Sequence, residues 1–301
     1  MTREPAARMR HVICHYHIYK NSGTTFDAML AANFSNRHLA FDGPFPYFSI
    51  GQHELAKIIQ RHPRAIAFSS HQVALPVPSA LDFNVLPVVF VRHPILRIYS
   101  IYRFKRVEED DTDTSRNAVD MAFDDWCRHA LAHAQELTQV SNAQVRLLCR
   151  TTGHPVSGRR TRDGMVYDLY QARRNLRNVE LLGRTEHFAR DVSRFPALLA
   201  AYGIGFEAGD TTPRNVTASD FDKTIEERLR EVEQTLSPDT WAALQAANRQ
   251  DLALYAETCE RLDAEPVPEP APAAPQAEPA AGEMSPGETT ATPSNVSSSS
   301  S

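Results

Sequence analysis

Residues 20–25 are the part of this chain best suited to hold an anion. They read Lys-Asn-Ser-Gly-Thr-Thr, after an apolar run (11–19) and before a helical pattern of apolar residues. That order predicts a buried strand, a tight loop and a helix N-terminus, where backbone N–H groups and the positive end of the helix dipole meet. Lys20 adds a positive charge, and the serine and threonines add hydroxyl donors. We therefore expect a phosphate or sulfate group to bind here.

The loop differs from the P-loop of nucleoside triphosphatases. That motif is G-x-x-x-x-G-K-[ST], with the lysine and a hydroxyl after the glycines. Here Lys20 precedes Gly23, and no Gly-Lys-[Ser/Thr] occurs anywhere in the chain. Taken alone, the segment also fits an ordinary strand-to-helix turn whose serine and threonines cap the helix.

A second candidate anion site follows another apolar segment. Residues 86–91 are nearly all apolar, as in a strand buried on both faces of a parallel sheet. Arg92 leaves this strand, and Pro94 suits the first turn of a helix. Ser100 lies about two turns along that helix and could face back toward the strand end. A guanidinium and a hydroxyl at one place suit phosphate oxygens, although an Arg paired with a nearby carboxylate is the simpler interpretation.

The elements that must position these groups alternate along the chain. Four apolar segments are candidate strands, at residues 12–18, 65–69, 86–91 and 179–182. Helical patterns lie near 25–34, 52–61, 95–106, 116–133, 141–150, 186–201, 220–235 and 238–260. This alternation predicts an α/β fold, P-loop-like, with a central parallel sheet between two helical layers.

Ligands of such folds bind at the carboxyl ends of the strands. Four polar residues come directly after predicted strands, namely Lys20, Ser70, His71 and Arg92. Their convergence is a second and independent indication of a site at that edge. Asp42 and Asp82 also lie near strands, but nothing in the sequence gathers other groups around them.

The whole chain has the composition of a globular protein with an unusual tail. Of its 301 residues 42% are hydrophobic, and the net charge is −5, which argues against a general nucleic-acid-binding protein. Residues 10–262 are predicted to form one catalytic domain. Residues 263–301 hold eight of the twenty prolines and end in five serines, so we expect a disordered tail.

The cysteines and apolar runs bear on location. Four scattered cysteines show no metal-binding spacing and suggest reduced thiols. No stretch reaches the ~20 apolar residues of a membrane span, and the N-terminus is not a convincing signal peptide. We therefore expect a cytoplasmic protein without an integral membrane segment. The oligomeric state is not readable.

Taken in order, the motifs resemble those of sulfotransferases that use 3′-phosphoadenosine 5′-phosphosulfate (PAPS). The likeness is to the carbohydrate type that includes the heparan sulfate 2-O-sulfotransferases, and it runs from about residue 11 to 256. It rests on the loop from Lys20 to Phe26 and on Arg92-His93-Pro94 with its helix. Further segments that agree in order are Asn142–Cys149, Leu181–Glu186, Asn215–Thr217 and Asp251–Tyr255.

The resemblance implies the sulfotransferase fold and in-line transfer of a sulfuryl group from PAPS to a hydroxyl of a carbohydrate or glycolipid, with no metal. Residues 20–25 would hold the 5′-phosphosulfate, with Lys20 neutralising charge on the leaving oxygen, and Arg92 with Ser100 would hold the 3′-phosphate. The cofactor-binding residues that it implies are Lys20, Asn21, Ser22, Gly23, Thr24, Thr25, Arg92, Ser100, Arg214 and Thr217. The chain departs from the family pattern at Tyr19, Asn21 and His93; the family has Asp at the last position, and its loss could leave Arg92 less firmly oriented.

The acceptor hydroxyl also needs a base. His71 resembles the catalytic histidine of the family, and an imidazole with a pKa near ~6.5 suits proton removal at neutral pH. A structural histidine at a strand end is the alternative. His15 and His17 are expected to pack or to line the pocket, either being a weaker rival base.

Two other functions remain open at this point. A P-loop nucleotide-dependent kinase would need a glycine before the lysine, a hydroxyl after it and a metal-binding carboxylate. A non-catalytic module that binds a nucleotide or an anionic glycan needs neither Lys20 nor His71. Basic residues that could bind an acidic acceptor, or simply be surface charges, are Arg103, Lys105, Arg106 and the cluster Arg159–Arg162.

Overall fold

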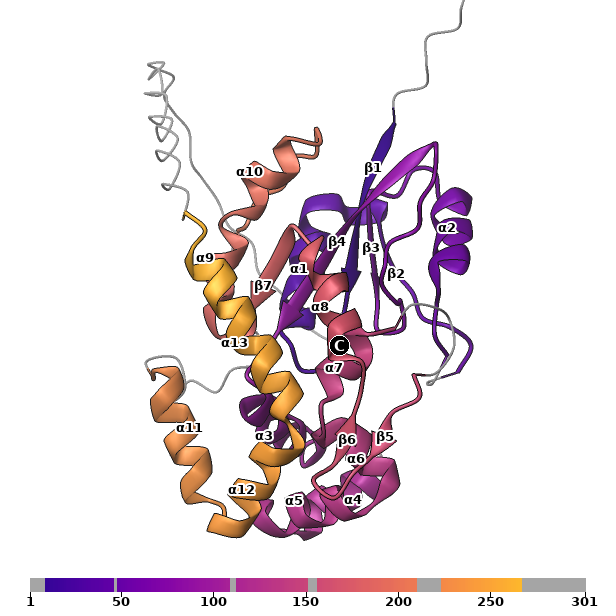
Figure 1. The fold of residues 1–301 in the computed structure, drawn as a ribbon. Coiled ribbons are helices and arrows are strands. Elements are labelled where there is room, and N and C mark those ends of the chain that lie inside the picture. The colour runs from indigo at the N-terminus through magenta and orange to yellow at the C-terminus, as the bar shows by residue number, and fades with distance from the viewer. Residues whose placement is uncertain (1–8, 46–47, 109–111, 151–155, 210–222, 267–301) are drawn as a thin grey trace, which may run out of the picture. The chain divides into compact units, whose positions relative to one another are not determined.

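The computed structural model describes residues 9–45, 48–108, 112–150, 156–209 and 223–266. Its centre is a five-stranded sheet in the order β2-β3-β1-β4-β7 (Figure 1). All neighbouring strands in it are parallel. The strands are β1 (Arg10–Tyr16), β2 (His38–Ala40), β3 (Ala67–Ser70), β4 (Phe83–Val91) and β7 (Leu181–Arg184). A separate two-stranded antiparallel ribbon joins β5 (Arg159–Arg160) to β6 (Met165–Val166).

Helices cover both faces of this sheet. They are α1 (Gly23–Phe34), α2 (Gln52–Arg61), α3 (Pro94–Lys105), α4 (Asp113–Asp120), α5 (Phe123–Ala132), α6 (Ala134–Val140), α7 (Ala143–Leu148), α8 (Leu169–Arg177), α9 (Phe188–Val192), α10 (Phe195–Ala200), α11 (Ile225–Gln234), α12 (Pro238–Ala247) and α13 (Arg249–Asp263). Two short 3₁₀ turns are η1 (Ser35–Arg37) and η2 (Thr185–His187).

Alternate residues of β1 face two different cores. Val12 and Cys14 pack with residues of α2, α7, α8 and α13, whereas Ile13 packs with residues of α1, α9 and α10. Because successive side chains of a strand point to opposite faces, these are the two sides of one sheet. The predicted α/β fold with a parallel sheet between helical layers is confirmed.

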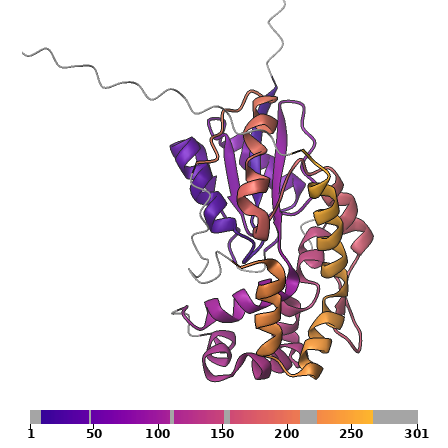
Figure 2. The same cartoon turned by 90° about the vertical axis from the view of Figure 1, so that its left-hand side faces the viewer.

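A third core lies beyond the sheet. It joins α3, α5, α11 and α12 around Trp126, which is 1% exposed. Figures 1 and 2 show these helices grouped at the end of the sheet toward which the strands point. Groups at the carboxyl ends of the strands therefore lie close to this helical part.

Some elements differ from the sequence-based expectation. β2 was missed because it is only three residues long. α6 and α8 were also missed, and the expected helix 116–133 is two helices that break at Met121 and Ala122. The expected helix 238–260 breaks at Asn248, whose amide donates to Val140 O and Leu244 O (2.7 and 2.9 Å). The helix expected at 186–201 starts as η2 and breaks between α9 and α10.

The predicted domain boundary at residue 262 lies near the end of α13 and stays a prediction. α13 ends at Asp263, and Glu265 pairs with Arg194 and Arg261. The chain divides after Pro268. Residues 267–301 lie outside the described residues, so the disordered tail stays a prediction. No helix of the described ranges is long and apolar enough to cross a membrane.

Candidate active site

The loop between β1 and α1 follows a left-handed path at two residues. The φ angle is 66° at Lys20 and 61° at Ser22. Such turns direct successive N–H groups toward one concave surface that suits an anion. Phe26 N donates to Ser22 O, the first bond of the helical ladder, so the N–H groups of Gly23 and Thr24 precede that ladder at the start of α1. The first turn of α1 holds no acidic residue, and Ser22 does not cap the helix with its side chain.

Asn21 braces this loop from inside the protein. Its side chain is 1% exposed, and its amide nitrogen donates to Phe90 O and to Gln144 Oε1, both at 2.8 Å. Gln144 in turn accepts from Arg92 N (2.9 Å) and donates to Arg92 O (2.8 Å). One buried glutamine therefore ties the loop after β1 to the end of β4. The amide nitrogen of Asn21 is engaged with the protein, and the cofactor contact expected of this residue stays a prediction.

The N-terminus of α7, which carries Gln144, is itself fixed from α13. The carboxylate of Asp251 accepts from Gln144 N (3.0 Å) and Val145 N (2.8 Å). Asn142 stands in the left-handed region and accepts from Asp251 N at 3.1 Å. The segments 142–149 and 251–255, which resemble family motifs, thus hold Gln144 in place beneath the loop.

Arg92 lies beside the loop, as the sequence predicts for a converging site. It is 9% exposed and donates from its guanidinium to Lys20 O at 2.9 Å. Its Nε lies 3.5 Å from the fully buried carboxylate of Glu186 and makes no hydrogen bond. Burial lowers the pKa of Arg92, while the charge of Glu186 opposes this. The structure thus leaves a donor of Arg92 unsatisfied next to the loop.

Glu186 contacts both Arg92 and the residue that follows it, His93. Besides Arg92, its carboxylate accepts from Tyr255 OH (3.1 Å) and from His93 N (3.4 Å). The ring of His93 meets Tyr255 edge-on at 5.5 Å, and burial lowers the pKa of His93. The guanidinium of Arg92 is thus held between Lys20 O and the carboxylate of Glu186, while Gln144 holds the backbone of Arg92.

Lys20 is held over an aromatic ring. Its Nζ lies 3.9 Å from the centre of the Phe104 ring on α3, a cation–π contact. Burial, with the charge of Arg92, lowers the pKa of Lys20 to about 8. A bound anion would favour the charged form and raise this pKa. The lysine is thus a cation at neutral pH, and the nearby carboxylate of Glu108 only partly offsets the effect of burial and of Arg92.

His71 forms a dyad with Asp42, a residue to which the sequence gave no role. Asp42 Oδ1 accepts from Ser70 Oγ (2.7 Å) and from His71 N (2.9 Å), and Oδ2 lies 3.2 Å from His71 Nδ1. The imidazole is 49% exposed. With Nδ1 directed at a carboxylate, Nε2 is the free ring nitrogen and can accept a proton. Burial, followed by the charge of His17, lowers the pKa of His71, so the ring is neutral at pH 7.

A second histidine–aspartate cluster adjoins this dyad. Asp27 on α1 lies 2.7 Å from His15 Nδ1 and 2.9 Å from His17 Nδ1, one oxygen for each ring. Although burial alone would raise it, hydrogen bonds from both histidines hold the pKa of Asp27 well below its usual range. Burial lowers the pKa of His15 to about 4.

The three ligand-type atoms of this cluster lie within 4.8 Å of one another. Ligand atoms around a tetrahedral zinc with bonds of about 2.0–2.1 Å stand roughly 3.3 Å apart. The contacts of 2.7 and 2.9 Å are shorter and fit N–H···O hydrogen bonds. We therefore describe them as hydrogen bonds, and the expectation that no metal is needed stays a prediction.

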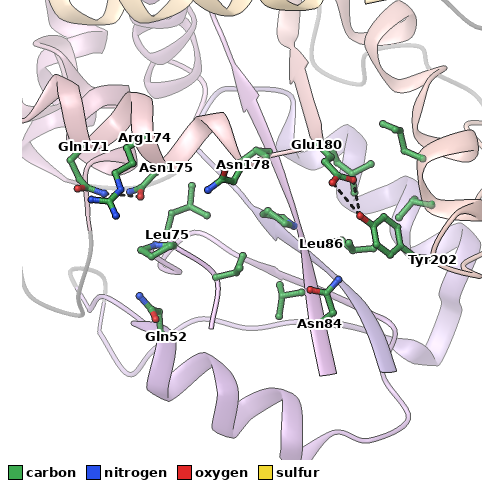
Figure 3. Close-up of a pocket in the computed structure, with 18 residues that line it drawn as sticks. Gln52, Leu75, Asn84, Leu86, Gln171, Arg174, Asn175, Asn178, Glu180 and Tyr202 are labelled. Atoms are coloured by element: carbon green, nitrogen blue, oxygen red, sulfur yellow. Dashed lines mark hydrogen bonds between the residues drawn. The ribbon is translucent and has the colours of Figure 1, made fainter. Parts of the chain in front are cut away.

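Both histidine–aspartate clusters open into one pocket at the carboxyl ends of β1, β2 and β3. Its volume is about 290 Å³, and its lining includes His17, Asp27, Asp42 and His71. A larger pocket, of about 480 Å³, lies elsewhere, beside the N-terminal half of β4 (Figure 3). That second pocket collects carboxamides such as Asn84 and Asn175 but none of the residues of the loop, so it takes no part in the site.

The other predicted site residues fall into three groups. Gly23 and Thr25 are buried at the start of α1, while Thr24 is exposed there. Ser100 is half-buried on α3, and no described hydrogen bond joins it to Arg92. Arg214 and Thr217 lie outside the described residues.

With this geometry in view, comparison with known proteins is decisive. A model of the sulfotransferase family matches residues 7–256. The chain belongs to the sulfotransferase family. This sulfotransferase is also similar to an uncharacterized protein of Archaeoglobus fulgidus, with 28% identity over 255 residues, which cover 82% of this chain and 95% of that protein. The family match spans the loop, Arg92 and both histidine–aspartate clusters.

Proposed function

We propose that this sulfotransferase moves the sulfuryl group of PAPS to a hydroxyl of a carbohydrate or glycolipid, with His71 as general base. The observation that carries the proposal is the meeting of a cationic loop and a carboxylate-paired imidazole at adjacent strand ends. Lys20 and Arg92 supply two cationic groups at the loop after β1. The His71–Asp42 dyad lies at the end of β3, which is the neighbour of β1 in the sheet.

The residues present fit the proposed donor. The left-handed turns at Lys20 and Ser22 and the start of α1 suit its 5′-phosphosulfate. The guanidinium of Arg92, which lies beside the loop and donates to Lys20 O, suits a further anionic group, for which the 3′-phosphate is the natural candidate. When bound, PAPS supplies an activated sulfuryl group. The chain's own part is to position the reactants and to stabilise charge.

Each residue then has a definite task. Lys20 neutralises negative charge that grows on the leaving phosphate oxygen, and each charged hydrogen bond of this kind contributes roughly 1.5–3 kcal/mol. His71 accepts the proton of the acceptor hydroxyl at Nε2, and Asp42 holds the opposite ring nitrogen and stabilises the imidazolium. Such a base commonly accounts for about 10²–10⁴ in rate.

Two of the basic residues singled out in the sequence are bonded within the protein, so we do not expect them to bind the acceptor. Lys105 is 7% exposed and donates to Thr114 Oγ1 at 2.6 Å, and Arg106 donates to Tyr102 OH at 3.1 Å. Both serve the helical part. Arg159 and Arg160 on β5 are exposed and remain candidates for acidic groups of a saccharide. Four free thiols support the proposed cytoplasmic location, and finding the protein only in a secreted fraction would contradict it.

Calorimetric titration tests the donor class directly. We expect 3′,5′-ADP, the proposed product, to bind wild-type protein without metal and more tightly than Mg-ATP. Lys20→Ala should weaken this binding about 10- to 100-fold, while Lys57→Ala, the same change on the exposed face of α2, should not. Preference for Mg-ATP would favour the kinase, and no binding by folded protein would favour the non-catalytic module. Labelled PAPS with a panel of saccharides and glycolipids then identifies the acceptor.

A further inference from the structure

His17 lies between the anion loop and the proposed base. Its ring stacks on that of His71, with centroids 4.0 Å apart and planes at 26°. On the other side, a Cβ placed on Gly23 would stand only 1.9 Å from His17 Cδ2 and Nε2. Only a glycine at the first residue of α1 leaves room for this edge of the imidazole. His17 Nε2 therefore lies against the start of α1, the end of the helix that we expect to face an anion.

The opposite side of the ring is fixed. His17 Nδ1 lies 2.9 Å from Asp27 Oδ2, and the other oxygen of Asp27 is taken by His15 at 2.7 Å. Since the carboxylate accepts, Nδ1 carries a hydrogen and Nε2 is the atom left for a ligand. Burial keeps His15 neutral, with its pKa lowered to about 4. The charge of Asp27 is therefore available to stabilise a protonated His17.

We infer that His17 is a second catalytic histidine, which donates Nε2–H to the sulfuryl group of the donor while His71 takes the acceptor proton. The inference rests on the proposed function and divides its chemistry between two stacked rings. Only the imidazolium has an N–H at both nitrogens, one for Asp27 and one for the anion. A bound anion favours that charged form, so donor binding should take up a proton.

The charges balance through the transfer. The acceptor oxygen forms a bond to sulfur, and the bond from sulfur to the 5′-phosphate oxygen breaks with its electron pair on 3′,5′-ADP. His71 Nε2 receives the hydroxyl proton, and His17 keeps its own. Both rings are then cationic, and Asp27 and Asp42 provide one carboxylate for each.

The titratable groups packed around His17 come from four elements. They are His15 from β1, Asp27 from α1, His71 after β3 and Asp42 after β2. His38 on β2 reaches the same network through Ser69, at 2.8 Å. Burial, and after it the charge of His17, lowers the pKa of His71, which keeps that ring neutral and able to act as a base.

Calorimetry with PAPS in the absence of acceptor, beside 3′,5′-ADP, tests this role. Only PAPS carries the sulfuryl group, so His17→Asn should weaken PAPS binding about 10- to 100-fold and 3′,5′-ADP binding far less. At pH 7 the binding enthalpy of wild type should vary with the ionisation enthalpy of the buffer, because a proton is taken up, and this dependence should vanish in His17→Asn. The matched control is His53→Asn on the exposed face of α2, which should behave as wild type.

A second variant guards against a folding defect. His17→Gln keeps an amide donor in reach but cannot ionise, so it should retain more PAPS affinity than His17→Asn and show no proton uptake. Equal loss of both nucleotides in folded variants, or unchanged PAPS binding, would overturn the inference and leave the proposed function standing. Failure of wild type to bind either nucleotide would instead overturn the proposed function.

Discussion

The site has two sides that differ in how their charged groups are held. The Lys20 side consists of Lys20 and Arg92, and the His71 side consists of His71, His17, Asp42 and Asp27. On the first, Arg92 is 9% exposed and fixed by bonds to backbone groups and to Gln144. On the second, His71 is 49% exposed, and two imidazoles face two carboxylates. Fixed cations with unsatisfied donors suit the binding of an anion. Balanced and more accessible acid–base pairs suit the movement of a proton, so the two sides are built for two steps of one reaction.

The largest expected effect comes from removing the proton acceptor. His71→Asn should lower kcat for sulfuryl transfer by about 10²–10⁴, the usual contribution of a general base. The affinity for 3′,5′-ADP should stay within about twofold of wild type, because the substitution does not touch the Lys20 side, where the nucleotide is proposed to bind. Steady-state kinetics with labelled PAPS and calorimetry check both values. A parallel loss of nucleotide affinity would mean that the two sides are not separate.

The second prediction concerns Gln144, the buried residue that connects the loop on the Lys20 side to the end of β4. Gln144→Leu removes three buried hydrogen bonds and strands their partners on Asn21 and Arg92. We expect a loss of about 2–4 kcal/mol in the free energy of unfolding, together with weaker nucleotide binding. Urea denaturation measures the first quantity. Gln245→Leu, at an exposed position of α12, is the matched control and should be nearly neutral.

A smaller effect is expected from the carboxylate of the His71 dyad. Asp42→Asn leaves the base in place but removes its charge partner, so kcat should fall about 10- to 100-fold. Since Asp42 raises the pKa of His71, its loss should also shift the acid limb of the rate profile to lower pH. Asp82→Asn is the control, because Asp82 is exposed at the other end of β4. An unshifted acid limb would show that Asp42 merely supports the fold.

The pH profile separates the two sides with the mildest change. The value of kcat/KM should rise with pH as His71 becomes neutral, at a pH below the usual range of histidine. It should fall above about 8 as Lys20 loses its proton. At pH 9 the loss should be about tenfold. Lys20→Arg should remove the part of this basic limb that Lys20 causes, because a guanidinium stays charged, and leave the acid limb unchanged. A basic limb that survives the substitution would belong to another group.

Much of this arrangement could be predicted because it is local in the sequence. The apolar run before Lys20, the glycine and hydroxyls after it, and the Arg-His-Pro start of α3 each mark a strand end. Strand patterns then placed Lys20, His71 and Arg92 at one edge of a parallel sheet. The contact from Arg92 to Lys20 O confirms that two of them meet.

Asp42 and Asp27 could not be found in this way, and Glu186 was marked only as the end of a segment that resembles a family motif. Asp42 follows a strand of three residues, too short to leave a periodic pattern, and it reaches Ser70 and His71 only because β2 pairs with β3. Asp27 occupies one position of a helix, and only packing of α1 against β1 turns it to His15 and His17. Nothing in the spacing distinguishes these carboxylates from surface charges.

The sequence by itself determined the α/β layers, the anion loop and the likeness to sulfotransferases, since each depends on neighbours within about one element. The tertiary structure alone decided which carboxylate serves which histidine and that Gln144 joins Asn21 to Arg92. These contacts span up to 123 residues of chain. Hydrogen bonds depend on distance and angle at a scale of tenths of an ångström, and only the packed sheet and its helices fix positions that finely.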